Sequence, residues 1–128
     1  MHRLLAALLL LLMPVEARAQ QVLGHYFARL GPQDMVNSSG ARLTDFSAIL
    51  QQDRANYHRF NRRDPDDTGD AFFASAAARA QIGRLCRVAP GNDYIPREVL
   101  RGVPRYVHVR ILGSGGRIIA IEVSEGAG

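Results

Sequence analysis

The residues whose types and spacing come closest to a chemical site lie in an acidic segment, residues 61–70 (NRRDPDDTGD). The segment holds four aspartates within seven residues, and Gly69 permits the sharp turn that a loop around an ion requires. The spacing matches the first half of the calcium-loop pattern D-x-[DN]-x-[DN]-G, with threonine at position 5. Such a loop offers the hard oxygen atoms that Ca²⁺ prefers. The candidate calcium ligands are Asp64, Asp66, Thr68 and Asp70.

The second half of the calcium motif is missing. Position 12 is Ser75 rather than a bidentate glutamate, and position 8 is Ala71 rather than a bulky apolar residue. An Asp-rich segment with proline and glycine is also typical of a solvated turn that caps two helices. In that interpretation the aspartates pair with Arg62 and Arg63. The sequence therefore leaves both interpretations open, with Ca²⁺ as the one cofactor that it suggests.

A second candidate site depends on a β-hairpin predicted near the C-terminus. Residues 105–112 and 117–124 alternate between polar and apolar side chains, and the Gly-rich stretch between them is typical of a turn. A three-residue loop at residues 114–116 would place the apolar side chains of both strands on one face. The pairs predicted to lie opposite each other on that face are Val107–Val123, Val109–Ile121 and Ile111–Ile119.

The same register places three polar side chains together on the other face. His108 would lie opposite Glu122, and Arg110 would follow two residues along. A histidine, a carboxylate and an arginine are the groups that a metal-independent ribonuclease uses as base, acid and phosphate clamp. Pairs of histidine and glutamate are also ordinary on the solvated face of a sheet. His108, Glu122 and Arg110 are thus the candidate catalytic residues.

Asp53 is a third notable residue, because it lies in the apolar stripe of a predicted helix at about residues 44–60. Thr44 is the predicted N-cap, and apolar residues recur along one face of the helix. An unpaired carboxylate in a core costs several kcal/mol, so Asp53 must be paired with an arginine, hydrogen-bonded or solvated. A catalytic or ligand-binding carboxylate is the alternative.

A second helix is predicted at about residues 71–87, with Asp70 as its N-cap and Pro90 beyond its end. Residues 22–30 suit either a helix or a strand. The predicted fold is therefore α+β: two packed helices against a small antiparallel sheet that contains the C-terminal hairpin.

Residues 1–19 have the organisation of a cleaved signal peptide. A short positive start precedes an apolar run at residues 4–13, and Ala17-Arg18-Ala19 forms a small-x-small cleavage site. The apolar run is half of the about 20 residues that span a membrane. We therefore expect an exported protein, periplasmic or secreted, with one small domain at residues 20–128 and no membrane span after cleavage. All 16 basic residues are arginine, which suggests a bacterial origin.

Several classes of function are disfavoured. The single Cys86 cannot form an internal disulfide. His25, His58 and His108 occur singly, without the spacing of metal ligands, and no Ser–His–Asp arrangement or phosphate loop is recognisable. Residues 79–117 hold eight arginines, but aromatic residues are not interleaved with them, so nucleic acid is disfavoured as a partner.

These observations favour an exported, non-enzymatic binding or accessory domain whose partner is a periplasmic or extracellular protein. Two alternatives stay open. The first is a calcium-binding exported domain that uses the segment Asp64–Asp70, and the second is a small secreted ribonuclease-like hydrolase that uses His108.

Overall fold

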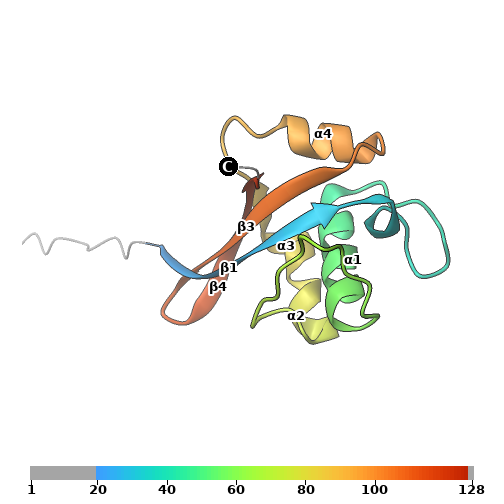
Figure 1. Cartoon of the computed structure of the whole chain (residues 1–128). Helices are drawn as coiled ribbons and strands as arrows, with labels where there is room; N and C mark the ends of the chain where they lie inside the picture. The colour runs from blue at the N-terminus through green and yellow to red at the C-terminus, as the bar shows by residue number, and fades with distance from the viewer. Residues whose placement is uncertain (1–19, 127–128) are drawn as a thin grey trace, which may run out of the picture.

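A four-stranded sheet in the order β1-β3-β4-β2 forms the centre of the computed structural model, which describes residues 20–126. The helices α1, α2 and α3 lie together on one side of this sheet (Figure 1). The predicted α+β fold is confirmed. The sheet is mixed rather than purely antiparallel, because its shortest strand runs parallel to β4. The strands are β1 (Gln21–Leu30), β2 (Cys86–Val88), β3 (Arg105–Ser114) and β4 (Arg117–Glu125).

Residues 22–30, whose pattern suited either a helix or a strand, belong to strand β1. From His25 onward its side chains alternate strictly, with Tyr26, Ala28 and Leu30 fully buried and the residues between them at least partly exposed. This alternation has the period of a strand that is buried on one face only. A helix over the same residues would place Tyr26 and Ala28 on different faces.

The helix predicted at residues 44–60 is α1 (Phe46–His58). Its N-cap is Asp45 rather than Thr44, since the Asp45 carboxylate accepts a hydrogen bond from the backbone N–H of Ser47. A short 3₁₀ turn, η1 (Pro32–Asp34), follows β1, and α4 (Tyr94–Leu100) connects β2 to β3.

The helix predicted at residues 71–87 is wrong as a single element. The chain instead forms α2 (Ala76–Ala80), α3 (Ile82–Leu85) and then β2. Asp70 does not cap a helix, because its carboxylate accepts hydrogen bonds from the N–H groups of Phe72 and Phe73 in a local turn. This turn competes with helix formation and carries Phe73 into the core. Ser75 is the N-cap of α2.

The predicted hairpin exists, but its register differs by two residues. Gly115 and Gly116, with φ of 59° and 80°, form a two-residue turn, and a bulge near Gly113 shifts the ladder. Val109 therefore pairs with Val123, and His108 lies opposite Ser124 instead of Glu122. A shift of two residues leaves each side chain on its predicted face, since the side-chain period of a strand is two. The exception is Ile119, which the bulge leaves 39% exposed.

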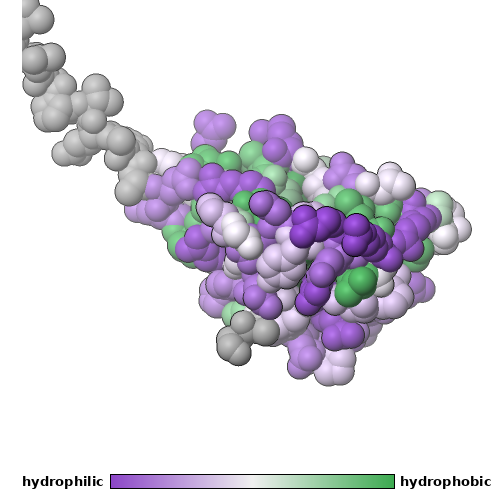
Figure 2. All heavy atoms as spheres, turned by 90° about the horizontal axis from the view of Figure 1, so that it is seen from above, coloured by the Kyte–Doolittle hydropathy of each residue, from purple (hydrophilic) through white to green (hydrophobic). Residues whose placement is uncertain are grey.

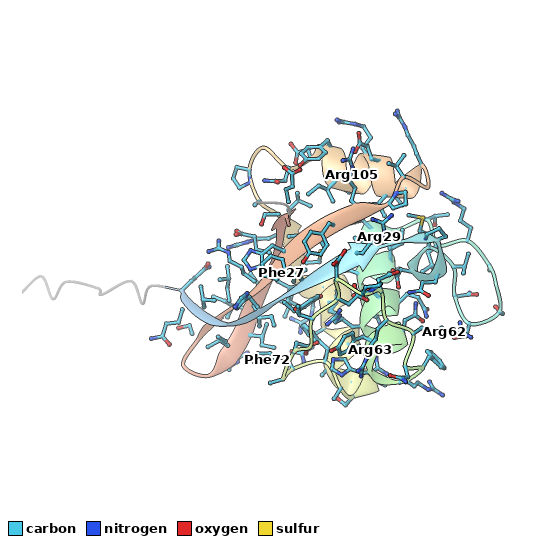
Figure 3. All side chains as sticks on the ribbon, in the orientation of Figure 1. Phe27, Arg29, Arg62, Arg63, Phe72 and Arg105 are labelled. Atoms are coloured by element: carbon cyan, nitrogen blue, oxygen red, sulfur yellow. The ribbon has the colours of Figure 1, made fainter. Side chains whose placement is uncertain are left out.

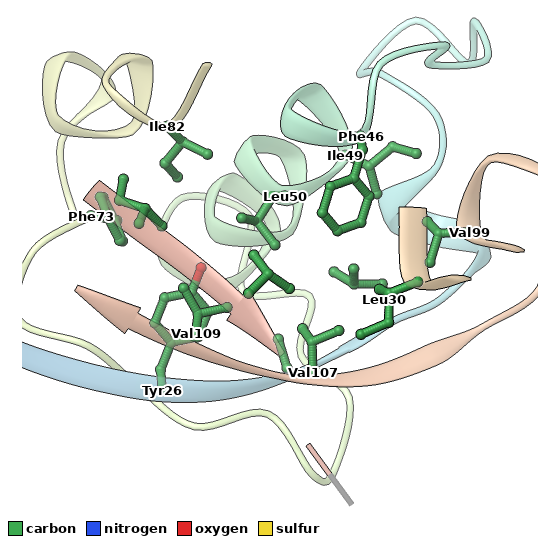
Figure 4. Close-up of a cluster of buried hydrophobic side chains, with 14 of the residues drawn as sticks. Tyr26, Leu30, Phe46, Ile49, Leu50, Phe73, Ile82, Val99, Val107 and Val109 are labelled. Carbon is green, nitrogen blue, oxygen red and sulfur yellow. The ribbon is translucent and has the colours of Figure 1, made fainter. Parts of the chain in front are cut away.

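The hydrophobic core lies between the sheet and the helices. The inward side chains of β1, β3 and β4 meet those of α1, α3 and α4, and Phe73 closes one end of the cluster (Figure 4). Burial of this apolar surface is the main stabilising contribution to the fold. Its fully buried large members include Tyr26, Leu30, Ile49, Leu50, Phe73, Ile82, Ile111 and Ile121.

The predicted signal peptide at residues 1–19 lies outside the described residues. Between Gln20 and Gly126, none of the helices combines the length and the apolar character needed to cross a membrane.

Candidate functional site

The acidic segment 61–70 covers the outer edge of β1. The backbone N–H of Thr68 donates to the carbonyl oxygen of Phe27 (2.9 Å), and the Thr68 hydroxyl accepts from the N–H of Phe27 (2.8 Å). Two residues along, the Asp67 carboxylate accepts from the N–H of Arg29 (2.8 Å). These bonds satisfy backbone groups that an edge strand otherwise leaves open to pairing with another chain.

The candidate calcium ligands do not converge. Asp70 accepts hydrogen bonds from Phe72, Phe73, Arg54 and His58, while Asp64 accepts one from Gln33. Across residues 20–126, no three His, Cys, Asp or Glu side chains are grouped so that they could hold a metal ion. Side-chain oxygens of Asp64, Asp67, Thr68 and Asp70 instead accept hydrogen bonds that hold the segment in place.

The ion pairs of this segment also differ from the sequence interpretation. Asp70 pairs with Arg54 (3.0 Å) and His58 (2.7 Å) rather than with Arg62 or Arg63. The Nε of Arg63 donates instead to the carbonyl oxygen of Tyr57.

Asp53 is buried and paired with Arg54, whose Nε donates to the Asp53 carboxylate at 2.9 Å. The Arg54 guanidinium lies between two aromatic rings, 3.9 Å from the centroid of Tyr26 and 4.6 Å from that of Tyr57. It also donates to the carbonyl oxygen of Thr68. Arg54 therefore ties α1 to the acidic segment, which has no regular secondary structure of its own.

The two carboxylates that share Arg54 differ in their pKa values. Burial raises the pKa of Asp53 to about 8, against the opposing charge of Arg54. Burial would also raise the pKa of Asp70, but hydrogen bonds from His58, Phe73, Phe72 and Arg54 outweigh it and lower the pKa. Asp70 is thus the carboxylate that balances the charge of Arg54 at neutral pH. The opposite pKa shifts of Asp53 and Asp70 indicate that these carboxylates and Arg54 have a structural role.

A related contact fixes the turn before α1. Burial raises the pKa of Asp34 to about 6. Its carboxylate accepts hydrogen bonds from Asn56 (2.9 Å) and from the N–H of Gly31 (3.0 Å).

The most chemically varied surface is the side of the sheet opposite α1–α3. We call it the open face. A polar row crosses it on all four strands, because His25 pairs with Arg110, Arg110 with Glu122, and Arg87 with Glu122. Figure 3 shows Phe27 and Arg29 following one another along β1, away from Phe72. The open face consists of His25, Phe27, Arg29, Arg87, Tyr106, His108, Arg110 and Glu122.

Glu122 is held by two arginines. Arg110 donates to one carboxylate oxygen, and Arg87 lies 3.5 Å from the other. The hydrogen bond from Arg110 lowers the pKa of Glu122, and the charges of Arg110 and Arg87 act in the same direction. Glu122 is therefore an ionised acceptor, which does not suit the role of a general acid.

Aromatic rings form a column beside the polar row. Phe27 stacks between Tyr106 (ring centroids 5.8 Å apart) and His108 (4.5 Å), with interplanar angles of 15° and 16°. His25 meets Phe27 edge-on at 5.9 Å. Phe27 therefore already stacks on two neighbouring rings, which limits the aromatic surface that a planar ligand could use.

The structure brings His25 to His108, a pairing that the sequence did not indicate. The Nδ1 of His25 lies 3.1 Å from the Nε2 of His108. Burial lowers the pKa of His108, and the nearby His25 and Arg110 lower it further. The alternation of β1 could have placed His25 on an outer face. Its contact with a histidine 83 positions away depends on the pairing of β1 with β3.

Of the three candidate catalytic residues, Arg110 and Glu122 are bound to each other, whereas His108 contacts His25 and lies opposite Ser124. No protein-family model, curated protein or solved structure matches the chain. The open face is therefore interpreted from its own geometry.

Proposed function

We propose that the protein is an exported binding domain without catalytic activity, which uses the open face to bind an acidic segment of a partner protein. The polar row carries the proposal. It places His25, Arg110 and Arg87 across all four strands, against the single carboxylate of Glu122.

The exposure of the row supports a ligand of opposite charge. The side chains of Arg87 and Arg110 are 46% and 41% exposed, whereas that of Glu122 is only 13% exposed. A partner therefore meets mainly the guanidinium groups. Figure 2, seen from above, shows a mostly hydrophilic surface with scattered hydrophobic patches. Because the row itself consists of charged and polar side chains, polar contacts would supply specificity.

The dimensions of the row suit a short extended peptide. Strands lie about 4.8 Å apart, so the row is roughly 14 Å long, which is about four residues of extended chain. Exposed ion pairs contribute about 0.2–1 kcal/mol each, and salt screens them. We therefore expect weak, salt-sensitive binding. Single-stranded nucleic acid is disfavoured because it binds by stacking bases on aromatic rings, and Phe27 is already stacked on Tyr106 and His108.

A hexaglutamate peptide is a suitable probe. Titrated into the ¹⁵N-labelled mature chain at low salt, it is expected to shift amide signals of β1, β3 and β4 near the polar row. The variant Arg87→Ala should weaken these shifts several-fold, while Arg84→Ala, which removes an exposed arginine of α3, should leave them unchanged. Equal weakening by both variants, or no effect of Arg87→Ala, would overturn the proposal.

Export rests on residues 1–19 and is tested separately. Mass spectrometry of the protein recovered from outside the cytoplasm of a bacterial host is expected to show a chain that begins at Gln20. A full-length chain retained in the cytoplasm would contradict this part of the proposal.

A ribonuclease-like hydrolase is the second candidate, and the contact between His25 and His108 favours it. Two adjacent imidazoles could supply a proton acceptor and a proton donor, with Arg110 near a phosphate. The test is cleavage of a labelled RNA oligonucleotide in EDTA. Activity that His108→Ala abolishes and Arg84→Ala retains would replace the binding proposal. Intact RNA would leave the binding proposal as the one to pursue.

A further inference from the structure

We propose that His25 and His108 form a binding site for an imidazole-preferring transition-metal ion, Zn²⁺ or Cu²⁺, on the open face. The proposal is independent of the acidic partner, since it concerns an ion binding to the protein alone.

The geometry of the two rings carries the proposal. His25 Nδ1 and His108 Nε2 point at each other across 3.1 Å. Two imidazole nitrogens at about 2.0–2.1 Å from a tetrahedral Zn²⁺ lie roughly 3.3 Å apart. To bind one ion, both rings must turn by roughly 35° from the N···N line, so that their lone pairs point at a shared centre.

Binding of a metal ion between the two histidines does not require the protein to release a proton. In the metal-free contact one nitrogen carries the hydrogen and the other accepts it. When an ion takes the place of that hydrogen, the donating ring moves its proton to its other nitrogen. Neither outer nitrogen, His25 Nε2 or His108 Nδ1, has a hydrogen-bond partner within residues 20–126. The alternative tautomer is thus open to both rings.

Phe27 preorganises the pair. It stacks on His108 and meets His25 edge-on, and the two imidazole rings are nearly perpendicular, at 88°. Rings that are held by packing lose little freedom when they bind an ion. His25 is exposed and His108 is partly exposed, so water or an anionic group can fill the remaining coordination positions.

The surrounding charges permit a cation. Arg110 lies beside His25 in the ladder and would repel an ion, but Glu122 binds Arg110 and offsets its charge, while Arg87 is one strand further away.

The test is calorimetric titration of ZnCl₂ and CuCl₂ into the mature chain at pH 7.5, produced without a histidine tag. One ion per chain is expected. His25→Ala and His108→Ala should each weaken binding at least tenfold, whereas the control His58→Gln should leave it unchanged. Mg²⁺ and Ca²⁺ should give no binding at these histidines, because hard cations prefer oxygen ligands.

Imidazole NMR keeps the test decisive if a variant unfolds. In the wild-type chain, Zn²⁺ should shift the ring nitrogens of His25 and His108 but not those of His58. The proposal is overturned if the titration shows no binding, which would leave the contact as a hydrogen bond only. Binding that survives both alanine substitutions, or that is lost in Asp66→Asn, would also overturn it.

Discussion

Replacing Arg54 should destabilise the protein far more than replacing its neighbour Asp53. In Arg54→Met, Asp70, whose side chain is 1% exposed, loses its ion pair with Arg54 and keeps His58 as a side-chain partner. Removing one partner of a buried pair typically costs about 3–5 kcal/mol, because the other charge is left uncompensated. The total free energy of unfolding of a small domain is about 5–15 kcal/mol. We therefore expect Arg54→Met to be marginally folded.

Asp53→Leu should lower the free energy of unfolding by less than Arg54→Met does. Because burial raises the pKa of Asp53 to about 8, the residue is largely protonated at pH 7 and no charge is lost. Arg54 keeps its bonds to Asp70 and to the Thr68 carbonyl. The substitution removes one hydrogen bond and leaves the buried Nε of Arg54 without that acceptor, which costs about 1–3 kcal/mol.

Urea denaturation at pH 7, followed by circular dichroism, measures both free energies of unfolding. Arg84→Met serves as the control, since Arg84 is exposed and has no side-chain partner within residues 20–126, so its replacement should change stability by less than about 0.5 kcal/mol. The reasoning is refuted if Asp53→Leu costs as much as Arg54→Met, because Asp53 would then be a buried charge that Arg54 must balance.

Urea denaturation at several pH values tests whether Asp34 and Asp53 are protonated in the folded state. The pKa values of Asp34 and Asp53 are raised, to about 6 and about 8, so the folded state holds protons that the unfolded state releases. The stabilisation is complete below the ordinary pKa near 4 and is lost as pH rises through the folded-state values. For Asp34 the shift corresponds to roughly 3 kcal/mol. We expect higher stability at pH 5 than at pH 8, and a flatter profile between pH 6 and 8 in Asp53→Asn. Equal stability of the wild type at pH 5 and 8 would contradict this.

Three further predictions follow from the edge of β1, the glycines and the acidic segment. Asp67→Ala removes the acceptor for the N–H of Arg29, so we expect a loss of about 1–2 kcal/mol and faster amide exchange at Arg29 by NMR; unchanged exchange would mean that the segment does not cover the strand edge. Gly83→Ala should stabilise the protein by about 0.5–1 kcal/mol, because Gly83 is in a helix and an added Cβ would contact no other atom. Gly116→Ala should destabilise the protein by a similar amount, because the φ angle of Gly116 is +80°. Thermal melts in which both substitutions change the melting temperature in the same direction would contradict the turn geometry. Millimolar Ca²⁺ should leave the melting temperature unchanged relative to EDTA, since the candidate ligands of the segment Asp64–Asp70 do not converge within residues 20–126. A rise of several degrees, lost in Asp66→Asn, would establish a calcium site.

The local patterns of the sequence determined the α+β class, the helix near residues 46–58 and the faces of the hairpin. These features follow from the spacing of apolar residues along a helix or a strand, which is visible within a short stretch of sequence. The period of two also explains why His108, Arg110 and Glu122 were placed on one face even though the register was shifted by two residues.

The contacts between distant segments were decided by the tertiary structure. Helix propensity favoured one helix over 71–87, but the turn at Asp70 and the parallel pairing of Cys86 with Ile121 replaced it. Both outcomes depend on burying Phe73 and completing the sheet, and neither contribution is visible in a local window.

The candidate site shows the same division. A strand at residues 22–30 was one of the two predictions for that segment, and the observed strand places His25 outward. Only the antiparallel pairing of β1 with β3 brings His25 against His108 and aligns the polar row across four strands. Strand order is set by the packing of the whole chain, because side-chain alternation fixes the face of each residue but not the neighbour of its strand.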